Sequence, residues 1–371
     1  MTTPPFRLPA VVPSSSLPEM LWLAQTDVIT VPLQTFGDRP LVQVVLNGHP
    51  ASFLLDTTVQ QTSVDAASLA DPDRSQAAQS LQIGALRFLR VPAIRNGVRA
   101  YSETYLGTET DGVIGADLLG RFPVALDYRA GTFSVFRTSA AAAAARPAQS
   151  MLVALTQTAG VPVLAVTLGG QRMGPFGIDT GSGMDFEVRS SLVSAKHLSM
   201  NGQLPELREA RVSGVMHGAT ARASGATIGL LQIGGPLVAM PDERQRWLPA
   251  GVDGMLGGRL LERMKLFIDV PGQNIVIAPI PNASPSVYDR SGAWLVSHGG
   301  EIFVHDVLPG SPADVAGLSI GDQILKINTV PVPSLELARQ SLVQLPGTHV
   351  VVRYRRGRRY HATTLVLRNL I

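Results

Sequence analysis

Two aspartates in this chain each end an apolar run and are followed at once by hydroxyl residues. One opens the string Asp179-Thr180-Gly181-Ser182-Gly183, and the other opens Asp56-Thr57-Thr58. A buried carboxylate costs several kcal/mol unless hydrogen bonds or solvent compensate it, and glycines allow backbone N–H groups to approach it closely. Two such carboxylates suit general acid–base chemistry on a water molecule, although either string alone is equally compatible with a tight turn.

The surroundings of Asp56 recur around Asp179, block by block and in the same order. Each copy has a strand-like run, the run that ends in aspartate, an Asp-Gly-apolar-apolar-Gly block and a closing strand, turn and strand. Four matched blocks in one order indicate an internal duplication, and duplicated units tend to pack about a pseudo-twofold axis. The matched pairs are 42–48 with 163–170, 53–58 with 176–181, 111–119 with 253–261, and 126–135 with 267–277.

A pseudo-twofold axis would bring Asp56 and Asp179 face to face. Two adjacent carboxylates cannot both ionise cheaply, so the pair would share one proton. The ionised member could then take a proton from water while the protonated member donates to the carbonyl oxygen under attack. This arrangement predicts hydrolysis of a peptide bond without a metal ion, a cofactor or a covalent intermediate.

The composition argues against several other kinds of site. The 371 residues include no cysteine, which removes disulfides, thiolate metal sites and cysteine nucleophiles. The seven histidines are scattered without metal-ligand spacing, and no Gly-x-Ser-x-Gly elbow occurs. A net charge of +3 gives no reason to expect nucleic acid as a partner, and no run reaches the roughly 18 apolar residues of a membrane span.

The remaining pattern is that of short strands and turns, which suits a chain with 36 glycines and 27 prolines. Strand-like alternation begins at Val28, and residues 1–27 form a Pro- and Ser-rich extension without the pattern of a signal peptide. The alanine-rich stretch 139–150 lacks an amphipathic stripe and is interpreted as a linker. Near the C-terminus, apolar runs on either side of Gly357 predict a hairpin with a charged, solvated tip.

The repeated order of apolar run, Asp-Thr-Gly triplet and Asp-Gly-apolar-apolar-Gly block resembles the pepsin- and retropepsin-like aspartic proteases, in their bacterial two-lobed form. The resemblance implies a mainly β fold in which residues 28–138 and 151–280 form two retropepsin-like β-barrel lobes about a pseudo-twofold axis. It also implies that Asp56 and Asp179 are the catalytic dyad. The residues implied as supports of the dyad are Thr57, Thr180, Gly181, Ser182, Gly115 and Gly257.

Two positions carry further expectations from this resemblance. The Ser182 hydroxyl would hydrogen-bond the dyad carboxylate and favour its ionised form, which implies an acidic optimum. Thr58 stands where the family has glycine, so its β-branched side chain would add bulk and resist a positive φ, with a displaced Asp56 as the cost. A catalytically inactive peptide-binding scaffold is therefore the alternative to an active endopeptidase.

The longer second copy contains a glycine-punctuated segment with strand-forming flanks, residues 212–221. It resembles the family's substrate-covering flap hairpin. The first copy offers no comparable segment, so one main flap is expected, with His217 as a solvent-exposed residue at its tip. The flap residues implied are Val212, Ser213, Gly214, His217 and Gly218.

Residues 286–371 resemble a PDZ domain of the bacterial protease-associated kind, a β domain with two helices. The resemblance rests on 310–313, 316–318, 321–322 and 324–328. PDZ domains bind an extended peptide as an added strand and capture its C-terminal carboxylate with backbone N–H groups, although the fold can also be a spacer. By resemblance the capturing loop is 291–295, where a core position for the tryptophan is equally compatible. The peptide-binding residues implied are Gly292, Ala293, Trp294, Leu295, Leu335 and Leu342.

The expected partners are a protein or peptide substrate at the dyad and peptide C-termini at the PDZ domain, in a monomer. Related PDZ-bearing hydrolases often work in the bacterial cell envelope, so the resemblance favours a periplasmic or cell-envelope location. A third interpretation takes the two aspartates as unrelated turn residues of a β-rich protein, and the four matched blocks argue against it.

Overall fold

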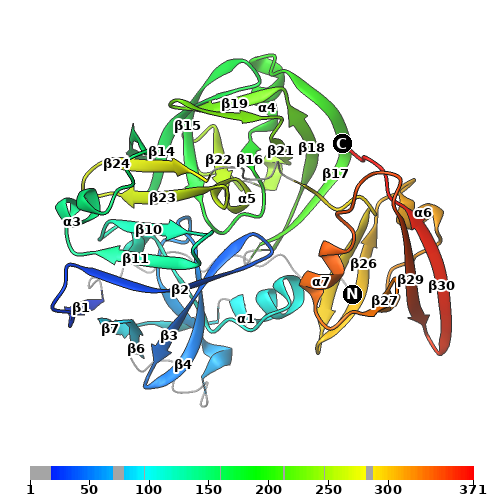
Figure 1. The fold of residues 1–371 in the computed structure, drawn as a ribbon, viewed down its shortest axis with the longest axis horizontal. Helices are drawn as coiled ribbons and strands as arrows, with labels where there is room; N and C mark the ends of the chain where they lie inside the picture. The colour runs from blue at the N-terminus through cyan, green and yellow to red at the C-terminus, as the bar shows by residue number, and fades with distance from the viewer. Residues whose placement is uncertain are drawn as a thin grey trace.

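The computed structural model describes residues 18–69, 79–95, 97–158, 160–211, 214–245, 247–280 and 287–371 (Figure 1). The expectation of a mainly β chain is confirmed: the strands of this part of the chain form three sheets, of 14, 10 and 6 strands. Strands of the first two sheets share one large apolar core. The third sheet, at the right of Figure 1, encloses a core of its own.

The 14-stranded sheet leads to the first aspartate. Strand β2 alternates exposed and buried residues with period two, because only one of its faces packs on the core. Asp56 directly follows β4, which pairs in parallel with β9. The strands of this sheet are β1 (Glu19–Trp22), β2 (Val28–Phe36), β3 (Arg39–Leu46), β4 (His49–Leu55), β5 (Ser63–Asp65), β6 (Gln79–Ile83), β7 (Leu86–Val91), β8 (Ala93–Ile94), β9 (Gly112–Ile114), β10 (Val124–Asp127), β11 (Thr132–Phe136), β12 (Met151–Ala154), β23 (Met264–Asp269) and β24 (Asn274–Pro279).

The 10-stranded sheet leads to the second aspartate in the same way. Asp179 is the last residue of β15, which pairs in parallel with β22. The two aspartates therefore have the same local strand pairing. The strands of this sheet are β13 (Thr156–Thr158), β14 (Val161–Leu168), β15 (Gln171–Asp179), β16 (Phe186–Val188), β17 (Met200–Arg211), β18 (Gly214–Ala223), β19 (Gly225–Ile228), β20 (Leu231–Gly234), β21 (Leu237–Pro241) and β22 (Gly254–Gly257).

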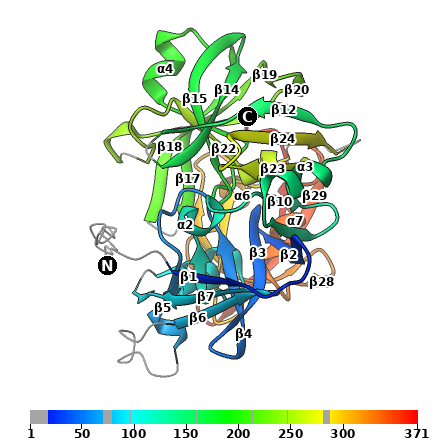
Figure 2. The same ribbon diagram turned by 90° about the vertical axis from the view of Figure 1, so that its left-hand side faces the viewer.

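Three strands of the second copy belong to the sheet of the first. β23 pairs with β10, with Val124 opposite Ile268, and β24 and β12 continue the row beyond it. Figures 1 and 2 both show β24, β23 and β10 side by side. The predicted division at 139–150 therefore does not separate the sheets, because the strands that close each copy pair with one another.

The alanine-rich stretch 139–150, predicted to be a linker, contains a short helix. Its first half forms α3, whose N-cap Thr138 accepts a hydrogen bond from Ala141 N at 3.1 Å. The helix buries Ala142 against Phe136 and Phe267, so a single small side chain anchors it without an amphipathic stripe. The helical segments are η1 (Ala66–Ser68), α1 (Val98–Tyr101), η3 (Ser102–Leu106), α2 (Ala116–Leu119), α3 (Ser139–Ala144), α4 (Ser190–Ala195), η4 (Glu243–Gln245), α5 (Gly258–Leu261), α6 (Pro312–Val315) and α7 (Leu335–Gln340).

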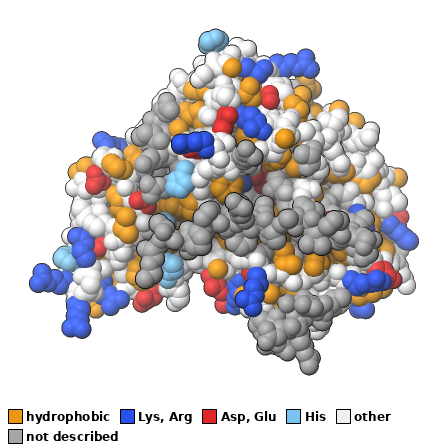
Figure 3. Space-filling view, turned by 180° about the vertical axis from the view of Figure 1, so that it is seen from behind, with side chains coloured by type: hydrophobic (Ala, Val, Ile, Leu, Met, Phe, Trp, Pro, Cys, Tyr) orange, Lys and Arg blue, Asp and Glu red, His pale blue; other side chains and the backbone are white. Residues whose placement is uncertain are grey.

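The C-terminal sheet packs α6 and α7 on its strands. The predicted hairpin around Gly357 is confirmed, because β29 and β30 pair along their whole length up to Arg356 opposite Arg359. Figure 3, seen from behind, shows Lys and Arg side chains projecting at the left edge, where this hairpin lies. The strands of the sheet are β25 (Ala293–His298), β26 (Glu301–Val307), β27 (Gln323–Ile327), β28 (Val330–Pro331), β29 (His349–Arg356) and β30 (Arg359–Val366).

Candidate active site

The threonine after each aspartate joins the two loops. Thr57 N donates to Thr180 Oγ1 at 3.1 Å, and Thr180 N donates to Thr57 Oγ1 at 3.2 Å. Each hydroxyl also donates across to the other copy, Thr180 Oγ1 to Leu55 O at 2.8 Å and Thr57 Oγ1 to Ile178 O at 2.5 Å. Both threonines are buried, so these reciprocal bonds satisfy groups that have no access to water. The structure thus brings the two aspartate loops together.

Gly181 lies between the two carboxylates. Its N–H donates to Asp179 Oδ1 at 2.9 Å, and a Cβ at this position would collide with Asp56 Oδ2. Asp56 is 7% exposed and Asp179 is 2% exposed. The φ of Gly181 lies outside the left-handed region, so glycine is needed here for close approach and not for its conformation.

Thr58 holds Asp56 in place, which corrects the expectation that it strains the turn. Thr58 N and Thr58 Oγ1 donate to Asp56 Oδ1 at 2.8 and 2.6 Å, and Val59 N adds a third bond to the same oxygen at 3.2 Å. Thr58 does not have a positive φ, so its β-branched side chain is compatible with the turn. Three donors on one oxygen are the surroundings of a carboxylate.

Arg211, which the sequence pattern did not mark as functional, lies against Asp179. Its Nη1 is 2.7 Å from Asp179 Oδ2. Its Nη2 contacts Glu187 Oε1, lies 3.3 Å from Glu209 Oε2 and donates to Ser182 Oγ at 3.0 Å. The Arg211 side chain is 13% exposed. A buried cation thus occupies one face of a carboxylate that the resemblance implies as catalytic.

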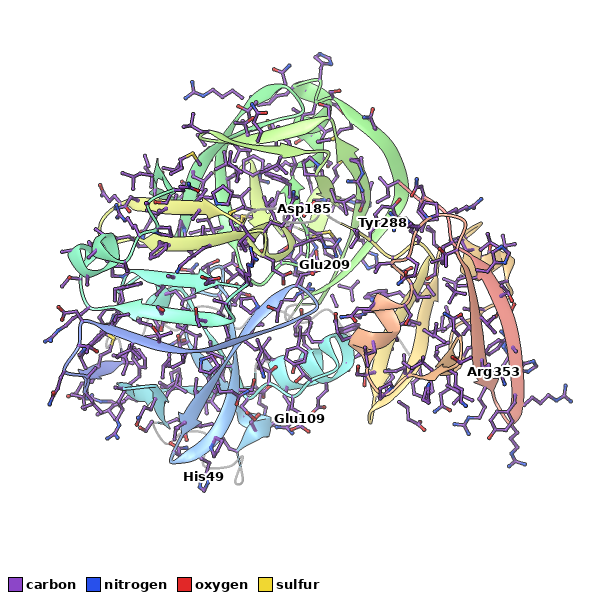
Figure 4. The ribbon with its side chains drawn as sticks, in the orientation of Figure 1. His49, Glu109, Asp185, Glu209, Tyr288 and Arg353 are labelled. Atoms are coloured by element: carbon purple, nitrogen blue, oxygen red, sulfur yellow. The ribbon has the colours of Figure 1, made fainter. Side chains whose placement is uncertain are left out.

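A second buried arginine, Arg39, continues this network. Its Nη2 lies 2.6 Å from Glu209 Oε1, and its Nε donates to Gly181 O at 3.3 Å. Gly183 N donates to the same Glu209 oxygen at 2.7 Å. Figure 4 labels Glu209 near the middle of the molecule, at the inner end of β17. Two guanidinium groups therefore neutralise part of the negative charge around Asp56 and Asp179.

The buried charges shift one another's protonation. Burial raises the pKa of Asp179 to about 7, Arg211 opposes the rise, and the Asp56 and Glu187 carboxylates add to it. Burial likewise raises the pKa of Glu187 against the pull of Arg211. Burial also tends to raise the pKa of Glu209, but Arg211 and Arg39 outweigh this effect and hold the pKa of this carboxyl below its usual value. Below about pH 7 the site therefore holds a protonated Asp179 beside a charged arginine.

The Ser182 hydroxyl does not hydrogen-bond the carboxyl of either aspartate, so that expectation was wrong. Its Oγ donates to Glu187 Oε1 at 2.5 Å and accepts from Met184 N at 3.2 Å. The physical reason is the burial of Glu187, which is 1% exposed and takes its hydrogen bonds from within the site. The hydroxyl that reaches a dyad carboxyl is that of Thr58 instead.

Gly115 and Gly257 lie behind the two loops. Gly257 is the strand partner of Asp179, and Ile114 O, just before Gly115, accepts from Asp56 N at 3.0 Å. A Cβ on Gly115 would collide with Val59 O, and one on Gly257 with the backbone of the loop after Asp179. Both positions must be small because the chain of the neighbouring loop passes over them.

Strands β17 and β18 form a long hairpin in the second copy, where the flap was expected. Arg211 pairs with Gly214 at its end, while Val212 and Ser213 lie outside the described residues. His217 is exposed but lies within β18, opposite Arg208, and not at the tip, because the paired strands continue beyond it to Arg211 and Gly214. Gly218 packs against the backbone of β21, where a Cβ would collide with Met240 O.

The predicted peptide-binding residues of the C-terminal sheet divide into two sets. Leu295, Leu335 and Leu342 have side chains buried in the core of this sheet. Of the three, Leu295 also lines the cavity between this sheet and the rest of the chain. Trp294 is partly buried and stacks on Tyr105 of η3, with ring centroids 5.7 Å apart. The surface that was predicted to bind a peptide therefore contacts the rest of the chain, and Trp294 makes this contact.

The loop expected to capture a peptide carboxylate already binds Asp289. Asp289 Oδ1 accepts from Ser291 N at 2.6 Å, from Ser291 Oγ at 2.5 Å and from Gly292 N at 3.2 Å. Ala293 N donates to Ser291 Oγ at 3.0 Å. These three amides have acceptors within their own chain, so a ligand carboxylate would have to displace Asp289.

The residues that sequence reasoning missed are Arg39, Glu187, Glu209 and Arg211. A signal was available for three of them. Glu209 and Arg211 are two residues apart in a strand, so their side chains lie on the same face. An acid and a base on one face can pair with each other and with further charged groups. Glu187 stands alone between apolar residues in β16, and a lone acid in such a strand indicates a buried partner.

Comparison with known proteins identifies one part of the chain. Residues 287–350 match the family model of the PDZ domain, so the predicted PDZ domain is confirmed there. No curated protein matches the chain in sequence. A similar solved structure is the crystal structure of basic 7S globulin from soybean, at 11% identity and a TM-score of 0.41, with 68% of this chain and 95% of that chain covered. In the part of the chain that the structure describes, no helix is long and apolar enough to cross a membrane.

Proposed function

We propose that this chain is an aspartic endopeptidase in which Asp56 and Asp179 activate water for attack on a peptide bond. The observation that carries the proposal is the union of the two aspartate loops. Reciprocal hydrogen bonds between Thr57 and Thr180 hold both carboxyl groups against Gly181. The raised pKa of Asp179 supports a pair that shares one proton.

The surroundings of the two carboxyls suggest their roles. Asp56 is held by three hydrogen bonds on one oxygen, so its other oxygen is suited to take a proton from water. Asp179 is protonated below about pH 7 and is suited to donate to the carbonyl oxygen under attack. The water oxygen bonds to the carbonyl carbon and gives a tetrahedral diol. As the C–N bond breaks, the proton held by Asp56 passes to the leaving nitrogen, and one diol hydroxyl returns a proton to Asp179 as the carbonyl re-forms.

Arg211 must move before this chemistry can proceed. Both oxygens of Asp179 are engaged, Oδ1 by Gly181 N and Oδ2 by Arg211 Nη1. Because Arg211 stands at the end of β17, lifting the hairpin β17–β18 would withdraw the guanidinium and open Asp179 to a substrate carbonyl. The PDZ domain would bind a peptide partner of the same enzyme.

The ion pair between Arg211 and Asp179 also favours a second candidate, a peptide-binding scaffold without activity. In that case the network of Arg39, Arg211, Glu187 and Glu209 is permanent and holds the two copies together. Peptide binding would then belong to the PDZ domain alone.

Cleavage of unstructured casein between pH 3 and pH 7 distinguishes the two candidates. The endopeptidase predicts cleavage that pepstatin inhibits and that falls at least about 100-fold in both Asp56→Asn and Asp179→Asn. Circular dichroism would show that both variants are folded. No cleavage by the folded wild-type chain at any pH would establish the scaffold.

A further inference from the structure

The surface of the PDZ domain that should receive a peptide is covered by this chain's own helical turn η3. PDZ domains take a peptide between the edge strand and the second helix, here β25 and α7. The ring of Tyr105 stacks on Trp294 of β25 at 5.7 Å and meets His305 of β26 edge-on at 6.0 Å. Figure 1 shows α1 and η3, in cyan, against α7, in orange.

Arg339 of α7 hydrogen-bonds both the covering segment η3 and strand β25. Its Nη1 donates to Tyr105 O at 2.8 Å and its Nη2 donates to Leu295 O at 2.9 Å. A peptide that adds to β25 as a strand needs the backbone groups of that strand, and Arg339 already holds one of them. Gly107 packs so closely on Leu335 of α7 that a Cβ there would collide with it. The cover therefore contacts both walls of the groove.

The same cover is continuous with the hairpin that carries Arg211. Tyr105 and Trp294 pack on a small apolar cluster that also contains Tyr101, Leu106 and Ala210. Ala210 is the residue before Arg211 and is 7% exposed, so a shift of η3 removes support from the inner end of β17. Val59, which donates to Asp56, packs on this cluster as well.

A cavity of about 700 Å³ gives an incoming peptide room at this junction. Trp294 and Arg339 of the PDZ domain line one side, and Arg39, Tyr101 and Glu209 line the other. Neither Asp56 nor Asp179 lines it, so it is separate from the dyad, yet it touches the charge network through Arg39 and Glu209.

We propose that residues 101–107 are a built-in ligand of the PDZ groove, and that an external peptide with an aromatic side chain displaces them and loosens the hairpin that holds Arg211 on Asp179. The rings of Trp294 and His305, with centroids 4.7 Å apart, form one aromatic surface on which the ring of Tyr105 now packs. The external peptide must therefore supply an aromatic ring to replace that of Tyr105. Loosening the hairpin should also speed cleavage, and this consequence alone rests on the proposed function.

Competition measures the first part of this proposal in the full chain. The probe, the tyrosine peptide, is a fluorescein-labelled peptide with the sequence of residues 102–108. The control, the alanine peptide, has the same sequence with alanine in place of tyrosine. If the internal segment fills the groove nine-tenths of the time or more, Tyr105→Ala binds the tyrosine peptide at least about tenfold more tightly than the wild-type chain does. The alanine peptide should bind neither chain, and Glu103→Gln, an exposed change on the same turn, should behave as wild type. Equal affinities for wild type and Tyr105→Ala would overturn the proposal.

Hydrogen exchange of the hairpin measures the second part without any use of cleavage. Excess tyrosine peptide added to the wild-type chain should speed exchange at 200–211 and 214–223 about tenfold or more, and the alanine peptide should not. This arm does not depend on the folding of a variant. Peptide binding with unchanged exchange in the hairpin would overturn the coupling. If exchange responds but casein is never cleaved, the proposed protease function fails and the competition at the groove stands.

Discussion

Arg211 Nη1 lies 2.7 Å from Asp179 Oδ2, so the hairpin β17–β18 places a charged group on one of two facing carboxyls. The charge is not isolated, because Glu187 and Glu209 share the same guanidinium. Burial would lower the pKa of Arg211, but these three carboxyls raise it well above its usual value. The contact thus occupies one oxygen of Asp179 and also supplies positive charge that offsets the carboxylates of the site.

Arg211→Gln should destabilise the chain more at pH 8 than at pH 5. Removing one partner of a buried ion pair costs about 3–5 kcal/mol, because the remaining charges lose their compensation. Without the guanidinium the pKa values of Asp179 and Glu187 rise further, so protonation at lower pH removes more of the uncompensated charge and the loss at pH 5 is smaller. Urea unfolding at the two pH values measures the difference. The exposed Arg244→Gln is the control and should change neither value, whereas equal losses at both pH values would contradict the account.

Thr57→Val and Thr180→Val should each lower the free energy of unfolding by about 1–3 kcal/mol, because each change leaves a buried amide and a buried carbonyl without partners. The double variant should lose less than the sum, since the four bonds form one network. Thr30→Val, whose hydroxyl bonds Ser134 on an exposed face, should cost less than about 0.5 kcal/mol. Strict additivity in denaturant titrations would show that the two threonines do not act as a unit.

On the proposed function, Gly181→Ala should reduce cleavage at least about 100-fold, because the new Cβ collides with Asp56 Oδ2 and moves a carboxyl that the proposed reaction needs. It should also cost about 1–3 kcal/mol of stability as an overpacked core position does. Gly234→Ala is the matched control, since a Cβ there meets nothing within 4 Å and its φ is ordinary. Initial rates on casein compare the two, and a Gly181→Ala chain with full activity would refute the placement of Asp56.

Glu262→Gln should stabilise the chain at pH 8 relative to pH 5. Burial raises the pKa of Glu262 to about 8, Asp38 and Glu336 add to the rise, and Arg259 and Arg39 oppose it. The unfolded carboxyl releases its proton near pH 4.5, so the folded state binds more protons between about pH 4.5 and 8 and stability falls as pH rises through this window. The amide does not titrate, and the difference between variant and wild type should grow by on the order of 2 kcal/mol. The exposed Glu301→Gln should show no such trend in thermal unfolding.

The local features of the site could be predicted from the sequence because they depend on short stretches. A run that ends in aspartate, hydroxyl and glycine fixes where the carboxyl stands relative to its strand, and the parallel partner follows from the Asp-Gly-apolar-apolar-Gly block. The PDZ domain was found for the same reason, since its turn and cap residues are contiguous.

The contacts that cross the molecule could not be predicted. Arg211 meets Asp179 only because a long hairpin folds back over the site, and no spacing rule links the two positions. Ser182 turned to Glu187 because a buried carboxylate elsewhere in the sheet needed a donor. The short α3 was missed because a helix that buries one alanine leaves no periodic pattern.

The pairing of β10 with β23 has a kinetic consequence. A hinge motion that parted the two copies would break this ladder together with the bonds between Thr57 and Thr180, so the dyad carboxyls keep a constant spacing. On the proposed function, admission of substrate then depends on the movement of one hairpin alone. Turnover would be limited by how often that hairpin opens and not by bond cleavage, and its rate would fall as solvent viscosity rises.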